Sequence, residues 1–309
     1  MRLAIFDDHR AGLVAADGTS LVDVSDLLRP EGQDLASGES WWVRACRDFA
    51  DLRPRLEQAA AERAATPLGS VHLLPPVLRP GKVVAAASNY ASHRAEMAEA
   101  RRRAGSARTG EGTFEVFLKA PTSIVGPGAT VRLPPGPLAQ GRAVHYETEL
   151  ALVIGRGGRD IAETDALSHV LGYTIAMDFT VRGAGDRSRR KSYDTFTPVG
   201  PWLTTADEVP DPESLDIRLQ VNGQLRQDGN SADLLVGLRG IIAYASSVMT
   251  LEPGDLLLTG TPPGVGPVVD GDALAAEIEL LGSMDLTVSG PGVGAPAAAA
   301  SRAAEGAAR

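Results

Sequence analysis

The sequence contains a single cysteine, Cys46, among 309 residues. One thiol excludes an intrachain disulfide and any metal site built on several cysteines, and it is typical of proteins in reducing compartments. The sequence also lacks any apolar stretch approaching the roughly 20 residues that a membrane-spanning helix requires, and its first residues carry no secretory signal. We therefore expect a cytoplasmic protein that makes no contact with a membrane.

Positive charge is also scarce, since the formal net charge is -9 and the pI is near 5.1. An acidic chain has no overall attraction for nucleic acid, so an anionic substrate must be held by local positive charge. Hydrophobic residues make up 43% of the sequence, which is enough for a substantial core in a chain of this length. The composition predicts a globular protein with a pocket for a small molecule.

Prolines at positions 67, 75, 76 and 80 divide the sequence. Before them, short apolar runs predict an antiparallel meander up to about residue 28, and apolar spacing of three to four predicts helix over residues 41–65, interrupted at Pro54. After them, closely spaced strand patterns favour a β-rich α+β domain. We expect a small N-terminal α+β domain over residues 1–75, a catalytic domain over residues 76–290 and a disordered tail over residues 291–309.

Two glutamates stand two residues apart where an alternating strand pattern, residues 145–154, becomes apolar. Glu147 and Glu149 should share a face, where they repel each other unless a cation lies between them. Oxygen ligands favour magnesium, manganese or calcium. A third carboxylate, Asp178, lies in the strand pattern of residues 171–180, on a face of small side chains. Exposed carboxylates on an amphipathic strand would give the same patterns.

A histidine and a glutamate follow another strand pattern, residues 82–87. On a short helix His93 and Glu96 share a face, so the carboxylate can orient the imidazole and raise its basicity, as activation of a water requires. An exposed pair on a solvated helix is the alternative. The segment from Arg101 to Gly112 has no apolar periodicity and predicts a mobile loop.

Two further segments carry candidate groups for an anion. The basic run at residues 187–191 is typical of a solvated loop, although the segment after Lys191 sets that lysine apart. The turn at residues 260–266 lacks the lysine and hydroxyl residue of a P-loop. It is predicted to present backbone N–H groups and the Thr261 hydroxyl to a small anion.

These motifs, in this order, resemble the fumarylacetoacetate hydrolase family over residues 80–290. The resemblance is carried by Asn89-Tyr90-x-x-His93-x-x-Glu96, Phe117-x-Lys119, Tyr146-Glu147-x-Glu149-Leu150, Gly172-Tyr173-Thr174 to Asp178, Lys191-Ser192-x-Asp194-Thr195-Phe196 and Gly260-Thr261-Pro262-x-Gly264-Val265-Gly266. It implies a catalytic domain of the mixed β-sandwich roll type and a homodimer. It also implies one divalent cation, Mg²⁺ or else Mn²⁺ or Ca²⁺, held by Glu147, Glu149 and Asp178.

The resemblance further implies a reaction on a small 2-oxo acid. The metal would polarise the ketone and stabilise the enolate that leaves when a carbon–carbon bond breaks. In this scheme Glu96 orients His93, which takes a proton from the attacking water, and Lys191 neutralises charge on the substrate. The helix that carries the pair resembles the family's lid. The expected substrate contacts are Tyr90, Lys119, Arg182 and Thr261.

The segment after Asp178 departs from the family pattern, which commonly continues with Arg-Asp and then a glutamine two positions on. Here Arg182 is followed by Gly183-Ala184-Gly185, so the acid and the amide are missing and the usual substrates are in question. We predict a metal-dependent hydrolase that cleaves a carbon–carbon bond in a 2,4-dioxo acid. A decarboxylase or isomerase of a 2-oxo dicarboxylic acid is one alternative, and a metal-dependent protein that only binds small acids is another.

Overall fold

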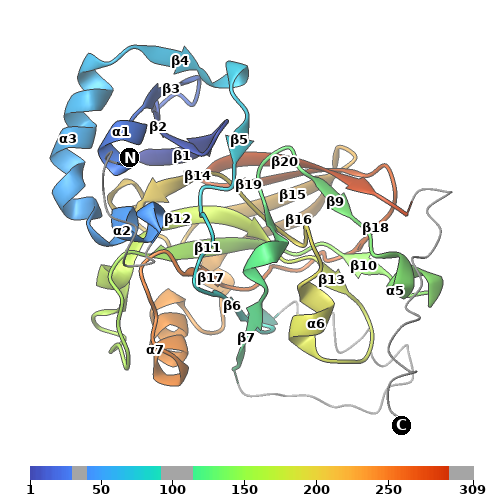
Figure 1. The fold of residues 1–309 in the computed structure, drawn as a ribbon. Helices are drawn as coiled ribbons and strands as arrows, with labels where there is room; N and C mark the ends of the chain where they lie inside the picture. Colours follow the sequence, from blue (N-terminus) through green and yellow to red (C-terminus); the bar gives the residue numbers. More distant parts are fainter. Residues whose placement is uncertain (30–39, 92–113, 292–309) are drawn as a thin grey trace, which may run out of the picture.

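A computed structural model describes residues 1–29, 40–91 and 114–291 of the protein. Its centre is a 12-stranded sheet that joins the N-terminal strands to those that carry the candidate ligands (Figure 1). In spatial order the strands are β4 (Ala65–Pro67), β3 (Ser20–Asp23), β2 (Arg10–Val14), β1 (Arg2–Phe6), β14 (Thr197–Thr205), β12 (Val170–Met177), β11 (Thr148–Ile154), β17 (Leu256–Leu258), β6 (Val83–Ala86) and β7 (Val116–Lys119). Two short strands join this path at its side, β5 (Leu73–Leu74) on β1 and β8 (Ile124–Val125) on β14.

Two smaller sheets complete the strand-rich part. One contains β16 (Gln224–Asn230), β15 (Asp216–Val221), β19 (Ala273–Ile278), β20 (Gly282–Ser289) and β9 (Thr130–Arg132). The other contains β13 (Thr180–Val181), β10 (Val144–His145) and β18 (Pro267–Val268). The five-stranded sheet shares one apolar cluster with the large sheet, so the two pack face to face. The prediction of a β-rich α+β protein is confirmed.

The central strands of the large sheet are buried on both faces. Along β11, Leu150, Leu152 and Ile154 enter the cluster shared with the five-stranded sheet, whereas Ala151 and Val153 enter a second cluster on the other face. Because successive side chains of a strand point to opposite faces, a strand covered on both sides reads as an unbroken apolar run. This explains the composition of residues 150–154.

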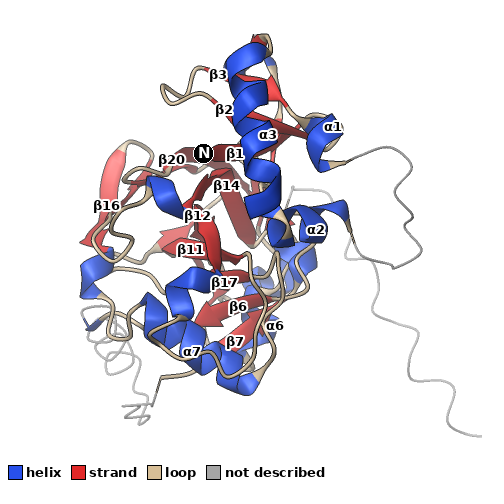
Figure 2. Ribbon diagram, turned by 90° about the vertical axis from the view of Figure 1, so that its left-hand side faces the viewer, coloured by secondary structure: helices blue, strands red, loops and turns tan. Residues whose placement is uncertain are grey.

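Helices cover both ends of the large sheet, with α2 and α3 beside the N-terminal strands and α7 at the opposite end (Figures 1 and 2). The helices are α1 (Ser25–Leu28), α2 (Trp41–Arg47), α3 (Phe49–Glu62), α5 (Pro135–Ala139), α6 (Arg187–Lys191) and α7 (Leu238–Val248). Short 3₁₀ turns are η2 (Leu68–Ser70), η3 (Pro121–Ser123), η4 (Ala166–His169), η5 (Ala206–Glu208) and η6 (Ser231–Asp233). The predicted interruption at Pro54 is wrong, because the chain breaks at Asp48 and α3 continues through the proline.

The N-terminal strands form the predicted meander, and β1 pairs with β14 from the centre of the chain. Trp42 and Leu56 of the N-terminal helices lie in the same apolar cluster as β11 and β17. The sheet and one core therefore cross the proposed boundary at residue 75, which stays a prediction. The expected tail lies almost wholly outside the described residues. Within the described segments, no helix has the length and apolarity needed to cross a membrane.

Candidate metal centre

The candidate ligands lie where the chain passes between sheets. The single strand predicted over residues 145–154 is wrong, because β10 ends at His145 and β11 begins at Thr148, with Tyr146 and Glu147 between them. The second predicted strand is divided in the same way, and Asp178 follows β12. The segment between β10 and β11 and the segment between β12 and β13 are the two strand crossings. They are neighbours, since the Asp178 N–H donates to the Glu147 carbonyl over 2.8 Å.

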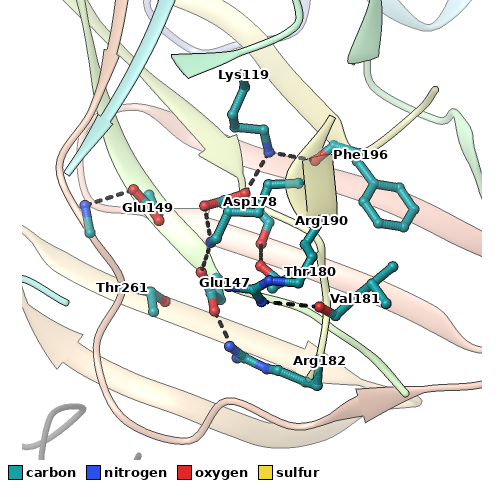
Figure 3. A network of polar contacts seen from close by, with 12 residues as sticks. Lys119, Glu147, Glu149, Asp178, Thr180, Val181, Arg182, Arg190, Phe196 and Thr261 are labelled. Carbon is teal, nitrogen blue, oxygen red and sulfur yellow. Dashed lines mark hydrogen bonds and ion pairs between the residues drawn. The ribbon is translucent and has the colours of Figure 1, made fainter. Parts of the chain in front are cut away.

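The pairing of β11 with β12 adds the third carboxylate. Glu149 stands opposite Ala176, and Asp178 lies two residues further along on the same face. Glu147, Glu149 and Asp178 are all buried, and their ligand oxygens lie within 4.8 Å of one another (Figure 3). Three carboxylates at this spacing fit a hard divalent cation such as Mg²⁺, Mn²⁺ or Ca²⁺.

Three side-chain cations lie against this carboxylate triad. Lys191 Nζ bonds Glu147 Oε2 at 2.7 Å and also Asp178 Oδ2. Lys119 Nζ donates to Asp178 Oδ1 at 2.6 Å and to the Phe196 carbonyl at 2.9 Å. Arg182 Nη2 donates to Glu147 Oε1 at 2.7 Å. The protein thus supplies part of the positive charge that the sequence had led us to expect from a metal ion alone.

Burial and charge shift the protonation of these groups. Burial, reinforced by the charge of Asp178, raises the pKa of Glu149 well above its usual range. Burial opposes the charge of Lys191, but Asp178, Glu147 and Glu149 raise its pKa above the usual value. Burial lowers the pKa of Lys119 despite its contact with Asp178. Among the described residues Glu149 forms no ion pair, so a bound cation would stabilise its charged form most directly.

The turn after β17 completes the centre. Gly260 has φ +105°, and a Cβ there would lie 2.9 Å from the Asn89 Cβ, so only glycine fits. Its N–H donates to Glu149 Oε2 at 2.6 Å. The Thr261 hydroxyl donates to the Thr148 carbonyl at 2.8 Å. These two donors, predicted to face a small anion, are engaged within the protein, and a substrate contact from Thr261 stays a prediction.

Comparison with known proteins places this centre in a family. Residues 82–289 match the family Fumarylacetoacetate (FAA) hydrolase C-terminal. The chain belongs to the fumarylacetoacetate hydrolase family. The resemblance inferred from the ordered motifs is thereby confirmed.

Several relatives of this family member match along most of its length. A maleylpyruvate hydrolase of Aquipseudomonas alcaligenes is 39% identical over 293 residues, which are 93% of this chain and 99% of that protein. The crystal structure of a maleylpyruvate hydrolase from Sphingobium sp. SYK-6 in complex with manganese (II) ion and pyruvate is 42% identical, with a TM-score of 0.80 over 94% of this chain and 99% of that chain. A mitochondrial oxaloacetate tautomerase, Fahd2a of Rattus norvegicus, is 39% identical over 91% of this chain and 90% of that protein.

One supporting residue of this family member was not found from the sequence. Gln227 of β16 is 0% exposed, and its Oε1 accepts the Thr148 N–H at 3.0 Å. Its Nε2 donates to Thr261 Oγ1 at 2.8 Å and to the Pro262 carbonyl at 2.9 Å. The Gln227 amide therefore links Thr148, which lies between the two glutamates, to the turn after β17, whose Gly260 N–H donates to Glu149.

Of the remaining predicted residues, the structure describes Tyr90 but not His93 or Glu96. Tyr90 is fully buried, and its hydroxyl has no hydrogen-bond partner among the described residues. Burial, with the charges of Glu149 and Asp233, raises the pKa of Tyr90. His93, Glu96 and the loop from Arg101 to Gly112 lie outside the described residues, so their roles stay predictions.

Proposed function

We propose that the protein is a divalent-metal-dependent hydrolase that cleaves an acylpyruvate-type 2,4-dioxo acid into pyruvate and a carboxylic acid. The observation that carries this proposal is the buried triad of Glu147, Glu149 and Asp178, with ligand oxygens within 4.8 Å. It lies in a chain that aligns with 99% of a maleylpyruvate hydrolase. Magnesium or manganese fits the oxygen donors best.

The residues around the triad support this chemistry. A divalent cation held there would supply Lewis-acid polarisation of the 2-oxo group. Lys191 is a buried ammonium beside two of the carboxylates, where it would neutralise negative charge that develops on a substrate oxygen. Lys119 and Arg182 each hold one ligand carboxylate through a hydrogen bond, which fixes its direction.

We assign the activation of water to His93, oriented by Glu96. His93 takes a proton from water, and the hydroxide adds to the distal carbonyl carbon of the substrate. The bond from that carbon to the neighbouring methylene carbon then breaks. The bonding electrons go to the pyruvate fragment, which takes up a proton, and the distal fragment leaves as a carboxylic acid.

The test is release of pyruvate from acylpyruvates, followed by coupled oxidation of NADH through lactate dehydrogenase. We expect turnover with magnesium or manganese, loss of turnover after chelation, and recovery when the metal is restored. A chain that binds the metal but releases no pyruvate from any acylpyruvate contradicts the proposal.

A second candidate is tautomerisation of oxaloacetate, which is favoured by the 39% identity to the tautomerase Fahd2a over 91% of this chain. Decay of the enol absorbance of oxaloacetate, without pyruvate release from acylpyruvates, would support this second activity instead. The homodimer and the cytoplasmic location also stay proposals. Light scattering of the purified protein measures the first directly.

A further inference from the structure

The short helix α6 lies beside β7, the last strand in the order of the large sheet (Figures 1 and 2). Two cations of α6 stand over the ring of Phe117 on this strand. The guanidinium carbon of Arg187 is 5.5 Å from the ring centroid, and Lys191 Nζ is 5.1 Å from it. Directly after the helix, the Ser192 hydroxyl accepts the Ala120 N–H at 2.9 Å. The strand β7 therefore supports α6 along its whole length.

The ring of Phe117 belongs to the strand face that also serves the carboxylate triad. Phe117 and Lys119 lie two residues apart on β7 and so share a face. Lys119 is 2% exposed, and its Nζ donates to Asp178 Oδ1 at 2.6 Å. Phe117 is half-buried and packs against the apolar cluster of this face. One face of β7 thus gives an ammonium to the triad and an aromatic ring to Lys191.

The Lys191 ammonium has three N–H donors. Two of them are used by Glu147 Oε2 and Asp178 Oδ2. The Phe117 ring lies within the separation of about 6 Å at which the electron-rich face of an aromatic ring attracts a cation. Because Lys191 is 6% exposed, little water competes with the ring for this ammonium. The cation–π contact is therefore of the strong, desolvated kind.

A divalent cation in the triad would affect these partners of Lys191 differently. Glu147 and Asp178 are candidate metal ligands, so the dication would draw on the carboxylate charge that holds the ammonium. The dication would also repel the ammonium directly. The ring of Phe117 is no ligand, and its attraction for Lys191 does not depend on the charge of the carboxylates. It is the partner that keeps its hold on Lys191 when a metal is bound.

We propose that Phe117 is a positioning residue, whose ring holds the Lys191 ammonium beside the substrate oxygen when a metal ion occupies the triad. The inference rests on the proposed function, in which Lys191 neutralises the charge that develops on that oxygen. Phe117 contacts neither substrate nor metal in this assignment and acts only through Lys191. A weaker hold should therefore lower kcat more than it changes KM.

Fluorination of the ring tests this attraction while the packing is kept. Phe117 is replaced by 4-fluoro-, 3,5-difluoro- and 3,4,5-trifluorophenylalanine, because each fluorine withdraws electron density from the ring face and changes the ring volume little. With saturating manganese, we expect kcat for acetylpyruvate to fall stepwise, by about 10- to 30-fold for the trifluoro ring, the scale of a desolvated cation–π contact. KM should change less than about threefold. A constant kcat across the series would overturn the assignment.

Controls separate the hold on Lys191 from other roles of the ring. Phe6 of β1 has Arg10 over its ring at 4.9 Å, and the same fluorine series at this residue should leave kcat unchanged. Phe117→Tyr keeps the aromatic face and should keep most of the activity, whereas Phe117→Leu should lose it. Arg187→Gln removes the other cation and should change kcat less than about threefold. If Arg187→Gln reproduces the loss, the ring acts by fixing α6, and the assignment to Lys191 fails.

Binding measurements keep this inference separate from the hydrolase proposal. Oxalate resembles the enolate of pyruvate, and its binding to the manganese-loaded protein needs no turnover. If the wild type releases no pyruvate from any acylpyruvate, the proposed function fails, and the oxalate affinity still reports the position of Lys191. We expect the trifluoro variant at Phe117 to bind oxalate about tenfold more weakly than the wild type, with unchanged manganese affinity. Equal oxalate affinities, or no oxalate binding to the wild type, would refute the role of Phe117.

Discussion

The candidate metal centre and the N-terminal region both contain ion pairs, but the two sets differ in exposure. At the centre, the side chains of Lys119 and Asp178 are 0% and 1% exposed. In the N-terminal region, Arg53 of α3 pairs with Asp207 of η5, and these two side chains are 35% and 42% exposed. Exposed pairs contribute little to stability, whereas removal of one partner from a buried pair leaves an uncompensated charge.

The two regions also differ in what holds them together. The N-terminal helices pack through apolar side chains such as Trp42 and Leu56, which are 1% and 0% exposed. The metal centre lies at two strand crossings, where side-chain hydrogen bonds replace the regular ladder. We infer that a single polar substitution at the centre changes both chemistry and stability, while the same kind of change in the N-terminal region changes stability slightly.

The largest expected effect follows from Asp178→Asn. Loss of one of three ligand carboxylates should reduce metal affinity and lower turnover at least about a thousandfold, since Lewis-acid catalysis contributes several kcal/mol. The free energy of unfolding of the metal-free protein should also fall, by about 3 kcal/mol, because Lys119 loses its buried counter-charge. Calorimetric manganese titration and urea unfolding measure the two effects.

Matched variants sharpen this test. Asp228→Asn makes the same chemical change at an exposed carboxylate of β16 and should alter neither property measurably. Asp178→Glu keeps the buried charge and should preserve stability better than it preserves turnover. Full activity of Asp178→Asn after chelation and restoration of magnesium would remove this residue from the metal centre.

The next effect concerns His93, whose role stays a prediction. His93→Ala should slow acylpyruvate hydrolysis about a hundredfold or more, the usual scale for loss of a general base. Metal affinity should change little, because the histidine is not proposed as a ligand. Glu96→Gln should give a smaller loss in the same direction. Unchanged hydrolysis in His93→Ala would shift the proposal to tautomerisation or decarboxylation.

Much of this arrangement followed from the period of the strands. Alternation predicted that Asp178 lies on a strand face of small side chains, and the antiparallel pairing of β11 with β12 adds that this face is the one on which Glu149 lies. Because central strands such as β11 and β17 are buried on both faces, they stand out as apolar runs. The Asn222-Gly223 dipeptide, a sequence typical of two-residue hairpin turns, lies between β15 and β16, where both residues have positive φ.

The features that the sequence did not predict depend on irregularities of the strands, which hydrophobic periodicity does not show. The passage from β10 to β11 at Tyr146 and Glu147 is a change of sheet, whereas the pattern of residues 145–154 is that of one strand. A register shift between Leu219 and Gln220 brings Gln227 opposite Leu219. Without this bulge Arg226 would stand opposite Leu219. Counting residues back from the turn therefore predicts, wrongly, that the Gln227 side chain points to the exposed face of the sheet.

A smaller loss is expected from Gln227→Ala, which tests the polar support of the centre. Three hydrogen bonds to Thr148, Thr261 and Pro262 disappear, which frees the turn whose N–H contacts Glu149. Manganese affinity should fall about tenfold, as for other residues that orient metal ligands. Gln220 on the neighbouring strand β15 is exposed, so Gln220→Ala serves as the control. An unchanged affinity would limit Gln227 to a structural role.

The smallest effect belongs to the exposed pair that joins the N-terminal helix α3 to η5, Arg53 and Asp207. Their hydrogen bond, at 2.6 Å between Nη2 and Oδ2, lowers the pKa of Asp207 below its usual value. A carboxyl whose pKa is lower in the folded than in the unfolded state adds stability above its unfolded pKa of about 3.9. This contribution is lost as the pH falls from there through the folded pKa. Asp207→Asn should therefore lower the free energy of unfolding by only about 0.5 kcal/mol at pH 7.

Urea unfolding of wild type and Asp207→Asn at pH 7, 5, 4 and 3 measures this difference as a function of pH. We expect it to stay constant between pH 7 and 5 and to shrink below about pH 4, where the unfolded carboxyl takes up a proton first. A double-mutant cycle with Arg53→Gln isolates the pair from the other contacts of each side chain. A coupling energy of about 3 kcal/mol would be as large as the loss of unfolding free energy that we expect for Asp178→Asn. Such a value would remove the distinction between exposed and buried pairs in this protein.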